Sequence, residues 1–126
     1  MPLEVAINKK EEGVFTVSCF GYIDTTTYMI LDKELAPILV PATRVIILNM
    51  EGVTYISSMG LGVIFKAKKI IEQYKGRLIM ANLQPQVRNV FDIIKALPPQ
   101  AIFTSMEEAD AYLTEIQKKN IEKKNI

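Results

Sequence analysis

The segment that decides the fold is Tyr55-Ile56-Ser57-Ser58-Met59-Gly60-Leu61-Gly62, which joins two stretches of different periodicity. Residues 44–50 before it are nearly all apolar and rich in β-branched side chains, as is typical of a strand buried on both faces. Residues 63–74 after it carry apolar side chains at helical spacing, and Gly76 follows as a stop signal. The segment therefore lies where a central strand is followed by a helix. In open α/β sheets this edge is where ligands and partners usually bind.

The serines and glycines of this segment are compatible with three kinds of chemistry. A phosphate-binding P-loop requires a Gly-Lys-Ser/Thr ending, which is absent. A nucleophile elbow requires Gly-x-Ser-x-Gly and a base, but that pattern is missing and the chain has no histidine. A serine that is itself modified stays open, because the free N–H groups at a helix start favour an anion. The simplest interpretation is that Ser57 or Ser58 caps the helix.

Composition limits the class of protein. A chain of 126 residues with 49% hydrophobic residues suits one folded domain. The net charge of +1 argues against a dedicated nucleic-acid binder. No apolar run approaches the roughly 20 residues that span a bilayer, and the N-terminus does not resemble a signal peptide. We therefore expect a cytoplasmic protein without membrane insertion or a cofactor, in which the single cysteine, Cys19, is a small core residue.

The order of the elements predicts the architecture. Periodicity indicates strands at residues 5–9, 14–20, 44–50, 77–81 and 101–104. Helices are expected to begin after Asp24, after the two serines, at Pro85 and at Ser105. The first two strands should form an antiparallel hairpin at a sheet edge. The prediction is an α/β fold, a single domain over residues 1–117 with a mixed, mostly parallel sheet of about five strands and about four helices. Residues 118–126 form a charged tail, either a helix end or disordered.

The helix after the serines has two distinguishable faces. At about 100° per residue, one face collects the predicted core residues Gly60, Val63, Ile64, Ala67, Ile70, Ile71 and Tyr74. Leu61 and Phe65 fall on the other side, in line with Ser58, and are expected to form a small exposed docking patch. The alternative is that a neighbouring loop or helix covers these two side chains.

Two motifs in this order of elements resemble a known family. Gly21-Tyr22-Ile23-Asp24 after the second strand, together with residues 56–62 after the third, resembles the STAS domain, and in particular the bacterial anti-sigma factor antagonists. Residues 103–109 are similar to the last strand and helix start of that family. The resemblance implies that Ser58 is phosphorylated, with Ser57 as a possible second target. The sequence departs from the family pattern at Ser57, where an aspartate is usual, and at Met59, which follows the target serine.

The resemblance also implies a mechanism of partner switching. The unphosphorylated domain would bind an anti-sigma factor of the serine kinase type, so that the sigma factor is released. Phosphorylation of Ser58 would end the binding, and a phosphatase would reset the switch. The implied partner-binding residues are Asp24, Ser57, Ser58, Met59, Gly60, Leu61 and Phe65. The domain would then be a substrate and a binder, with no catalytic residues of its own.

Two other classes of function stay open on the sequence alone. The chain could be a STAS subunit of another assembly, such as a lipid-transport complex or a stress-signalling scaffold, that binds a partner through the same edge without phosphorylation. It could also be a ligand sensor that holds a nucleotide or a lipid between strand and helix.

Overall fold

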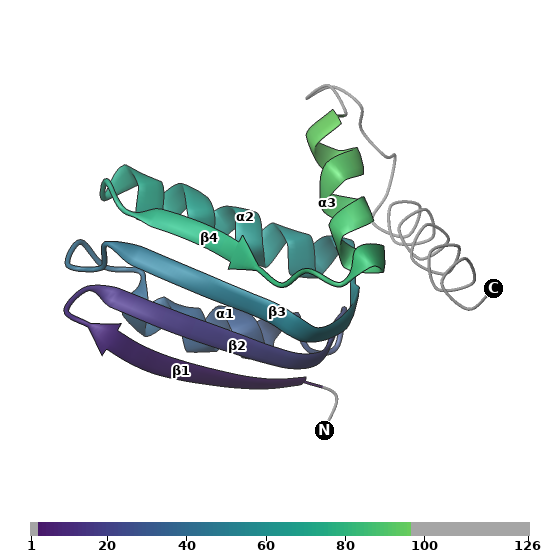
Figure 1. Cartoon of the computed structure of the whole chain (residues 1–126), viewed down its shortest axis with the longest axis horizontal. Helices are drawn as coiled ribbons and strands as arrows, with labels where there is room; N and C mark the ends of the chain where they lie inside the picture. The colour runs from purple at the N-terminus through teal and green to yellow at the C-terminus, as the bar shows by residue number, and fades with distance from the viewer. Residues whose placement is uncertain (1–2, 97–126) are drawn as a thin grey trace.

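The computed structural model describes residues 3–96 (Figure 1). The elements in chain order are β1 (Leu3–Glu11), β2 (Val14–Ile23), α1 (Tyr28–Leu35), the 3-10 helix η1 (Ala36–Ile38), β3 (Val45–Ile56), α2 (Ser58–Gln73), β4 (Arg77–Ala81) and α3 (Pro85–Ala96). The described part of the chain thus confirms the α/β class with four strands and three α-helices, fewer than the expected five and four. The strand expected at 101–104, the helix expected from Ser105 and the tail at 118–126 lie outside the described residues.

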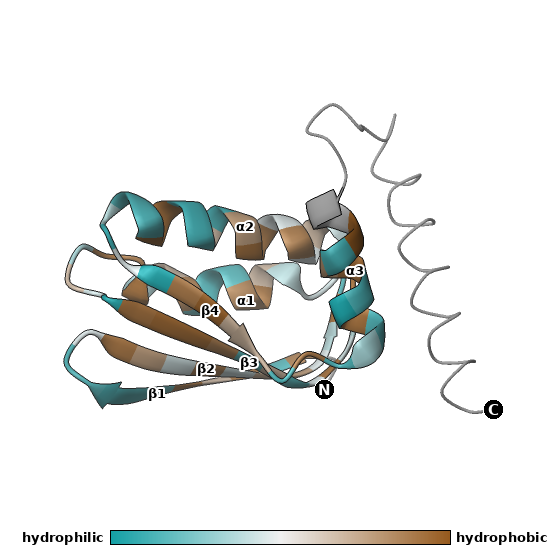
Figure 2. Cartoon of the chain, turned by 45° about the horizontal axis from the view of Figure 1, so that its top comes forward, coloured by the Kyte–Doolittle hydropathy of each residue, from teal (hydrophilic) through white to brown (hydrophobic). Residues whose placement is uncertain are grey.

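The four strands form one sheet in the order β1-β2-β3-β4. β1 pairs antiparallel with β2, whereas β2 with β3 and β3 with β4 pair in parallel, which confirms the mixed sheet and the hairpin at its edge. Each crossover joins neighbouring strands and progresses across the sheet in the same direction. Because such connections are right-handed, α1 and α2 lie on the same face of the sheet (Figure 2).

The core lies between that face and the two helices. In β3, Ile46, Leu48 and Met50 are completely buried, while the residues between them are only partly covered. The helices contribute Leu31 and Leu35 from α1 and Ile64 and Ile71 from α2, all at most 1% exposed. At the carboxyl ends of the strands, α3 extends the same core with Val87, Val90 and Phe91. This α3 segment adds a packing surface beside the start of α2 (Figure 1).

The central strand is longer than predicted. β3 continues beyond residue 50 to Ile56 and stays paired with β2, although the register shifts twice along the way. Gly52 makes room for this pairing, since a Cβ there would overlap the ring of Phe20 and lie 2.9 Å from the carbonyl oxygen of Cys19. As a result Ser57 alone separates β3 from α2, and the expected loop is reduced to a single residue.

The prediction of the core face of α2 holds over most of the helix and is wrong at its end. Gly60, Val63, Ile64, Ala67 and Ile71 are buried, but Tyr74 is 43% exposed. The reason is that α2 ends at Gln73. Tyr74 is the C-cap, with φ −90° and ψ 10°, so its side chain stands at the open end of the helix rather than over the core.

Candidate functional site

Ser57 joins the ends of two parallel strands to the start of α2. Its side chain accepts a hydrogen bond from the backbone N–H of Gly60 at 3.2 Å, so Ser57 is the N-cap of α2. Its own backbone N–H donates to the carbonyl oxygen of Ile23 at 2.8 Å, at the end of β2. Ser57 is only 1% exposed. Its hydroxyl is therefore used by the fold, and its burial argues against a second phosphorylation target.

Ser58 is the more accessible of the two serines. It is the first residue of α2 and is partly exposed. The first turn of this helix contains no acidic residue. A phosphate on Ser58 would lie at the positive end of the helix dipole, where negative charge is favoured. Ser58 thus combines access with a setting that tolerates an anion.

The two glycines of the segment have different roles. A Cβ on Gly60 would lie 2.9 Å from the carbonyl oxygen of Ile23 and 2.6 Å from the Cγ2 of the same residue. Gly60 therefore allows the first turn of α2 to approach the end of β2. Gly62, in contrast, is exposed, and a Cβ there would meet nothing within 4 Å. The fold needs a glycine at position 60 but not at position 62.

Asp24 organises the turn between β2 and α1. Its Oδ1 accepts hydrogen bonds from the N–H and the hydroxyl of Thr26, at 2.9 and 2.8 Å, and from the N–H of Thr27 at 3.1 Å. Burial opposes ionisation of this carboxyl, but the hydrogen bonds from the two threonines outweigh it and lower the pKa of Asp24. The neighbouring Ile23 bonds to Ser57, so the charged turn lies beside the start of α2.

The predicted patch of Leu61 and Phe65 is wrong for its first member. Leu61 is only 4% exposed and belongs to the same core cluster as Val90 and Phe91 of α3. Phe65 is 39% exposed, and its ring meets that of Phe91 edge to face at a centroid distance of 6.0 Å. The periodicity of α2 distinguishes its own faces but cannot show that α3 packs on the second one. Leu61 is therefore a core residue, and only Phe65 of the predicted patch stays partly exposed.

Sequence reasoning missed other apolar side chains near Asp24. Met29 and Ile30, in the first turn of α1, are 64% and 38% exposed, and Tyr22 at the end of β2 is 51% exposed. A signal for the two α1 residues was present, because both fall outside the stripe formed by Leu31 and Leu35. Met29 and Ile30, with the partly exposed Met59, thus leave apolar side chains accessible on the two helices that follow Asp24 and Ser57.

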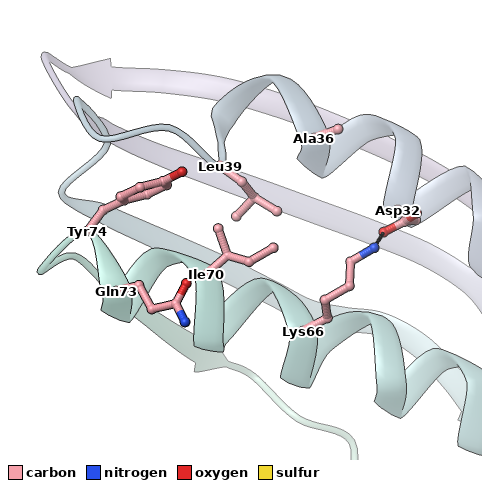
Figure 3. A pocket seen from close by; sticks show the side chains of 7 residues that line it. All are labelled: Asp32, Ala36, Leu39, Lys66, Ile70, Gln73 and Tyr74. Carbon is pink, nitrogen blue, oxygen red and sulfur yellow. Dashed lines mark ion pairs between the residues drawn. The ribbon is translucent and has the colours of Figure 1, made fainter.

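A cleft between α1 and α2 lies apart from this edge (Figure 3). It encloses about 360 Å³, and Leu39 and Ile70 point toward each other across it. An ion pair between Lys66 and Asp32, at 2.9 Å, spans the cleft toward one end. Because it follows the second half of α2, this cleft is not part of the Ser58 edge. Within residues 3–96, no three acidic or cysteine side chains come together as potential metal ligands.

The family follows from the sequence match. Residues 6–109 match the STAS domain. The chain belongs to the STAS domain family. Among curated relatives, this STAS domain is 31% identical over 102 residues to BtrV of Bordetella bronchiseptica, a candidate anti-sigma factor antagonist, covering 81% of this chain and 88% of BtrV. It is 28% identical over 83 residues to the anti-sigma-B factor antagonist of Staphylococcus aureus, covering 66% of this chain and 77% of that protein.

Solved structures show the same fold. The unphosphorylated form of the anti-sigma factor antagonist SpoIIAA superposes with a TM-score of 0.65 at 23% identity, covering 89% of this STAS domain and 97% of that chain. The phosphorylated form of SpoIIAA from Bacillus gives a TM-score of 0.63 at 23% identity, covering 84% and 96%. The anion transporter SLC26A9 contains the fold as well, with a TM-score of 0.60 at 14% identity over 90% of this chain and 22% of that one. In the described part of our chain, no helix has the length and apolarity needed to span a bilayer.

Proposed function

We propose that this STAS domain is an anti-sigma factor antagonist that acts by partner switching. In its unphosphorylated form it binds an anti-sigma factor serine kinase, and phosphorylation of Ser58 ends that binding. The names of the relatives support this role. The observation that carries the assignment of the site is the difference between the two serines: Ser57 is buried and caps α2, whereas Ser58 is partly exposed at the helix start.

The surroundings of Ser58 explain how one phosphate could switch binding. The exposed Met29 and Ile30, in the first turn of α1, offer apolar contact area near the turn of Asp24. A phosphate adds a charge of about −1.5 to −2. That charge lies beside the turn of Asp24, whose lowered pKa keeps it ionised near neutral pH. A partner surface shaped for a neutral hydroxyl would have to desolvate this negative charge, so binding is lost.

The fold itself should survive phosphorylation. The positive end of the helix dipole at the start of α2 favours an anion there. The helix is held by a long buried face that includes Ile64, Ala67 and Ile71, which the phosphate does not reach. The likeness of this chain to both forms of SpoIIAA supports a switch that alters the surface and leaves the domain folded.

The test is phosphorylation by a candidate serine kinase homologue of the same organism. The purified chain is incubated with ATP and the kinase, and its intact mass and its affinity for the kinase are measured. The wild type should gain the mass of one phosphate and lose affinity, and Ser58→Ala should gain none while still binding. The matched control is Ser57→Asp. Aspartate is also a strong N-cap, but a serine kinase cannot phosphorylate it at position 57. This variant should still be phosphorylated at Ser58.

Two results would contradict the proposal. In the first, the mass of every form stays unchanged and no kinase homologue binds. This result would reject the switch and favour the role of a STAS subunit in another assembly, or of a ligand sensor. Phosphorylation of the Ser58→Ala variant would leave the switch in place but show that the wrong residue was assigned.

A further inference from the structure

A buried threonine holds the turn that carries Asp24. Thr27 is only 1% exposed and stands at the N-cap position of α1, but its side chain makes no capping bond to that helix. Its hydroxyl reaches back to the end of β2 instead, where it donates to the carbonyl oxygen of Tyr22 at 2.6 Å and accepts from the N–H of Asp24 at 2.9 Å. The hydroxyl therefore bridges the two peptide groups that flank Ile23.

One peptide group links Thr27 to the start of α2. The N–H of Asp24 and the carbonyl of Ile23 belong to the same planar peptide unit. Thr27 accepts from the N–H of this unit, and its carbonyl oxygen accepts from the N–H of Ser57 at 2.8 Å. Ser58 follows directly as the first residue of α2. The hydroxyl of Thr27 thus fixes the peptide group to which the start of α2 is bonded.

The same threonine orients the carboxylate of Asp24. The Oδ1 atom accepts from the N–H of Thr27 at 3.1 Å, and the Thr27 hydroxyl oxygen lies 3.1 Å from it as well. Thr26 adds its N–H and its hydroxyl, at 2.9 and 2.8 Å. All four contacts are made to Oδ1, and Oδ2 takes part in none of them. A donor from a partner can therefore bond to Oδ2 without breaking the turn.

We propose that Thr27 is a positioning residue for partner binding. Its hydroxyl holds the carboxylate of Asp24 and the start of α2 in one fixed arrangement, so that a partner meets Asp24 and Ser58 together. Contacts that are in place before binding need not be ordered by the partner, which lowers the cost of association. This inference rests on the proposed function and names the residue that joins its two contact points.

A purely structural role for Thr27 predicts a different outcome. Loss of its hydroxyl would take this partner away from the N–H of Asp24 and the carbonyl of Tyr22, which destabilises the folded domain in either case. Only a positioning role makes the contribution of Asp24 to binding depend on Thr27. The test must therefore measure how one residue depends on the other, in addition to stability.

The first test removes the hydroxyl from the full-length chain. Thr27→Val has nearly the same shape but lacks the hydroxyl, whereas Thr27→Ser retains it. The affinity of each unphosphorylated, folded variant for the serine kinase is measured by titration calorimetry. Thr27→Val should bind about tenfold more weakly, and Thr27→Ser should stay within about twofold of the wild type. The matched control is Thr25→Val in the same turn, whose exposed side chain lies outside the bonds described above. This control should bind as the wild type does.

The second test asks whether Asp24 depends on Thr27. Asp24→Asn is made alone and together with Thr27→Val, and its effect on affinity should be about tenfold smaller in the Thr27→Val background. Burial raises the pKa of Asp24, and the hydrogen bonds from the two threonines lower it by more. Loss of the Thr27 hydroxyl should therefore raise this pKa, as measured by NMR titration. Additive effects on affinity would show that Thr27 only stabilises the fold and would overturn the inference.

The outcomes separate the two proposals. If the kinase binds and phosphorylates Ser58 but Thr27→Val binds as tightly as the wild type, the positioning role is overturned and the proposed function stands. If no kinase binds, or if Thr27→Val does not fold, amide hydrogen exchange of the wild type is measured instead. One opening of the shared peptide group releases the N–H groups of Asp24 and Ser57 together, so both should show about the same protection. Clearly unequal protection would overturn the inference, while equal protection without kinase binding would support the arrangement and reject only the kinase as its partner.

Discussion

The two glycines at the start of α2 allow a paired test of how the Ser58 edge is positioned. In Gly60→Ala the added methyl group would lie 2.6 Å from Cγ2 and 2.9 Å from the carbonyl oxygen of Ile23, and 3.0 Å from Cγ1 of Ile56. Because a backbone carbonyl cannot rotate away like a side chain, α2 must shift. Overpacking of this kind costs about 1–3 kcal/mol, and three close contacts place Gly60→Ala near the upper end. Better helix propensity returns at most about 1 kcal/mol.

The net expectation for Gly60→Ala is a loss of about 2 kcal/mol in the free energy of unfolding, which lowers the melting temperature by roughly 8 °C for a domain of this size. Gly62→Ala meets no atom within 4 Å. It should therefore stabilise the protein by up to about 1 kcal/mol through helix propensity alone. The free energies of unfolding of both variants are obtained from urea unfolding monitored by circular dichroism. Equal stability of the two variants, or a more stable Gly60→Ala, would refute the argument that Gly60 sets the approach of α2 to β2.

Three further predictions concern the same region and the core. Leu61→Ser should lower the free energy of unfolding in urea by about 3 kcal/mol, since truncation of a buried leucine typically costs about 2–5 kcal/mol. Phe65→Ser should cost distinctly less, and equal losses for the two variants would contradict the difference in their burial. Ser57→Ala should cost about 1 kcal/mol through the lost cap, and Ser57→Asp should restore the stability of the wild type in the same assay. Burial raises the pKa of Cys19 to about 12 from its ordinary 9.0. As the pH rises, the thiol therefore ionises in the unfolded state before it does so in the folded state. The contribution of the buried thiol to stability is complete below pH 9 and is lost between pH 9 and 12. The unfolding midpoint should consequently fall more steeply with pH across this range in the wild type than in Cys19→Ala.

Much of the fold could be predicted from local patterns. The apolar run of residues 44–50, the helical spacing after Ser58 and the proline at position 85 each mark an element from its own residues. Since alternation of such elements implies a parallel sheet covered by helices, the α/β class and the place of Ser58 at the carboxyl edge also follow. The extension of β3 to Ile56 could not be predicted in this way, because its pairing with β2 continues past the point where the apolar pattern is interrupted.

The roles of individual residues at the edge were decided by tertiary structure. Either serine could have been the cap of α2, and only the hydrogen bond from Gly60 assigns that role to Ser57. Leu61 lies outside the core face defined by α2 alone and is nevertheless buried in the core cluster, while Phe65 meets Phe91 of α3. Periodicity describes an element relative to itself, whereas burial depends on every element that packs against it. The sequence by itself therefore determined where the segment with the two serines lies, and the tertiary packing decided which of its side chains are buried and which are accessible.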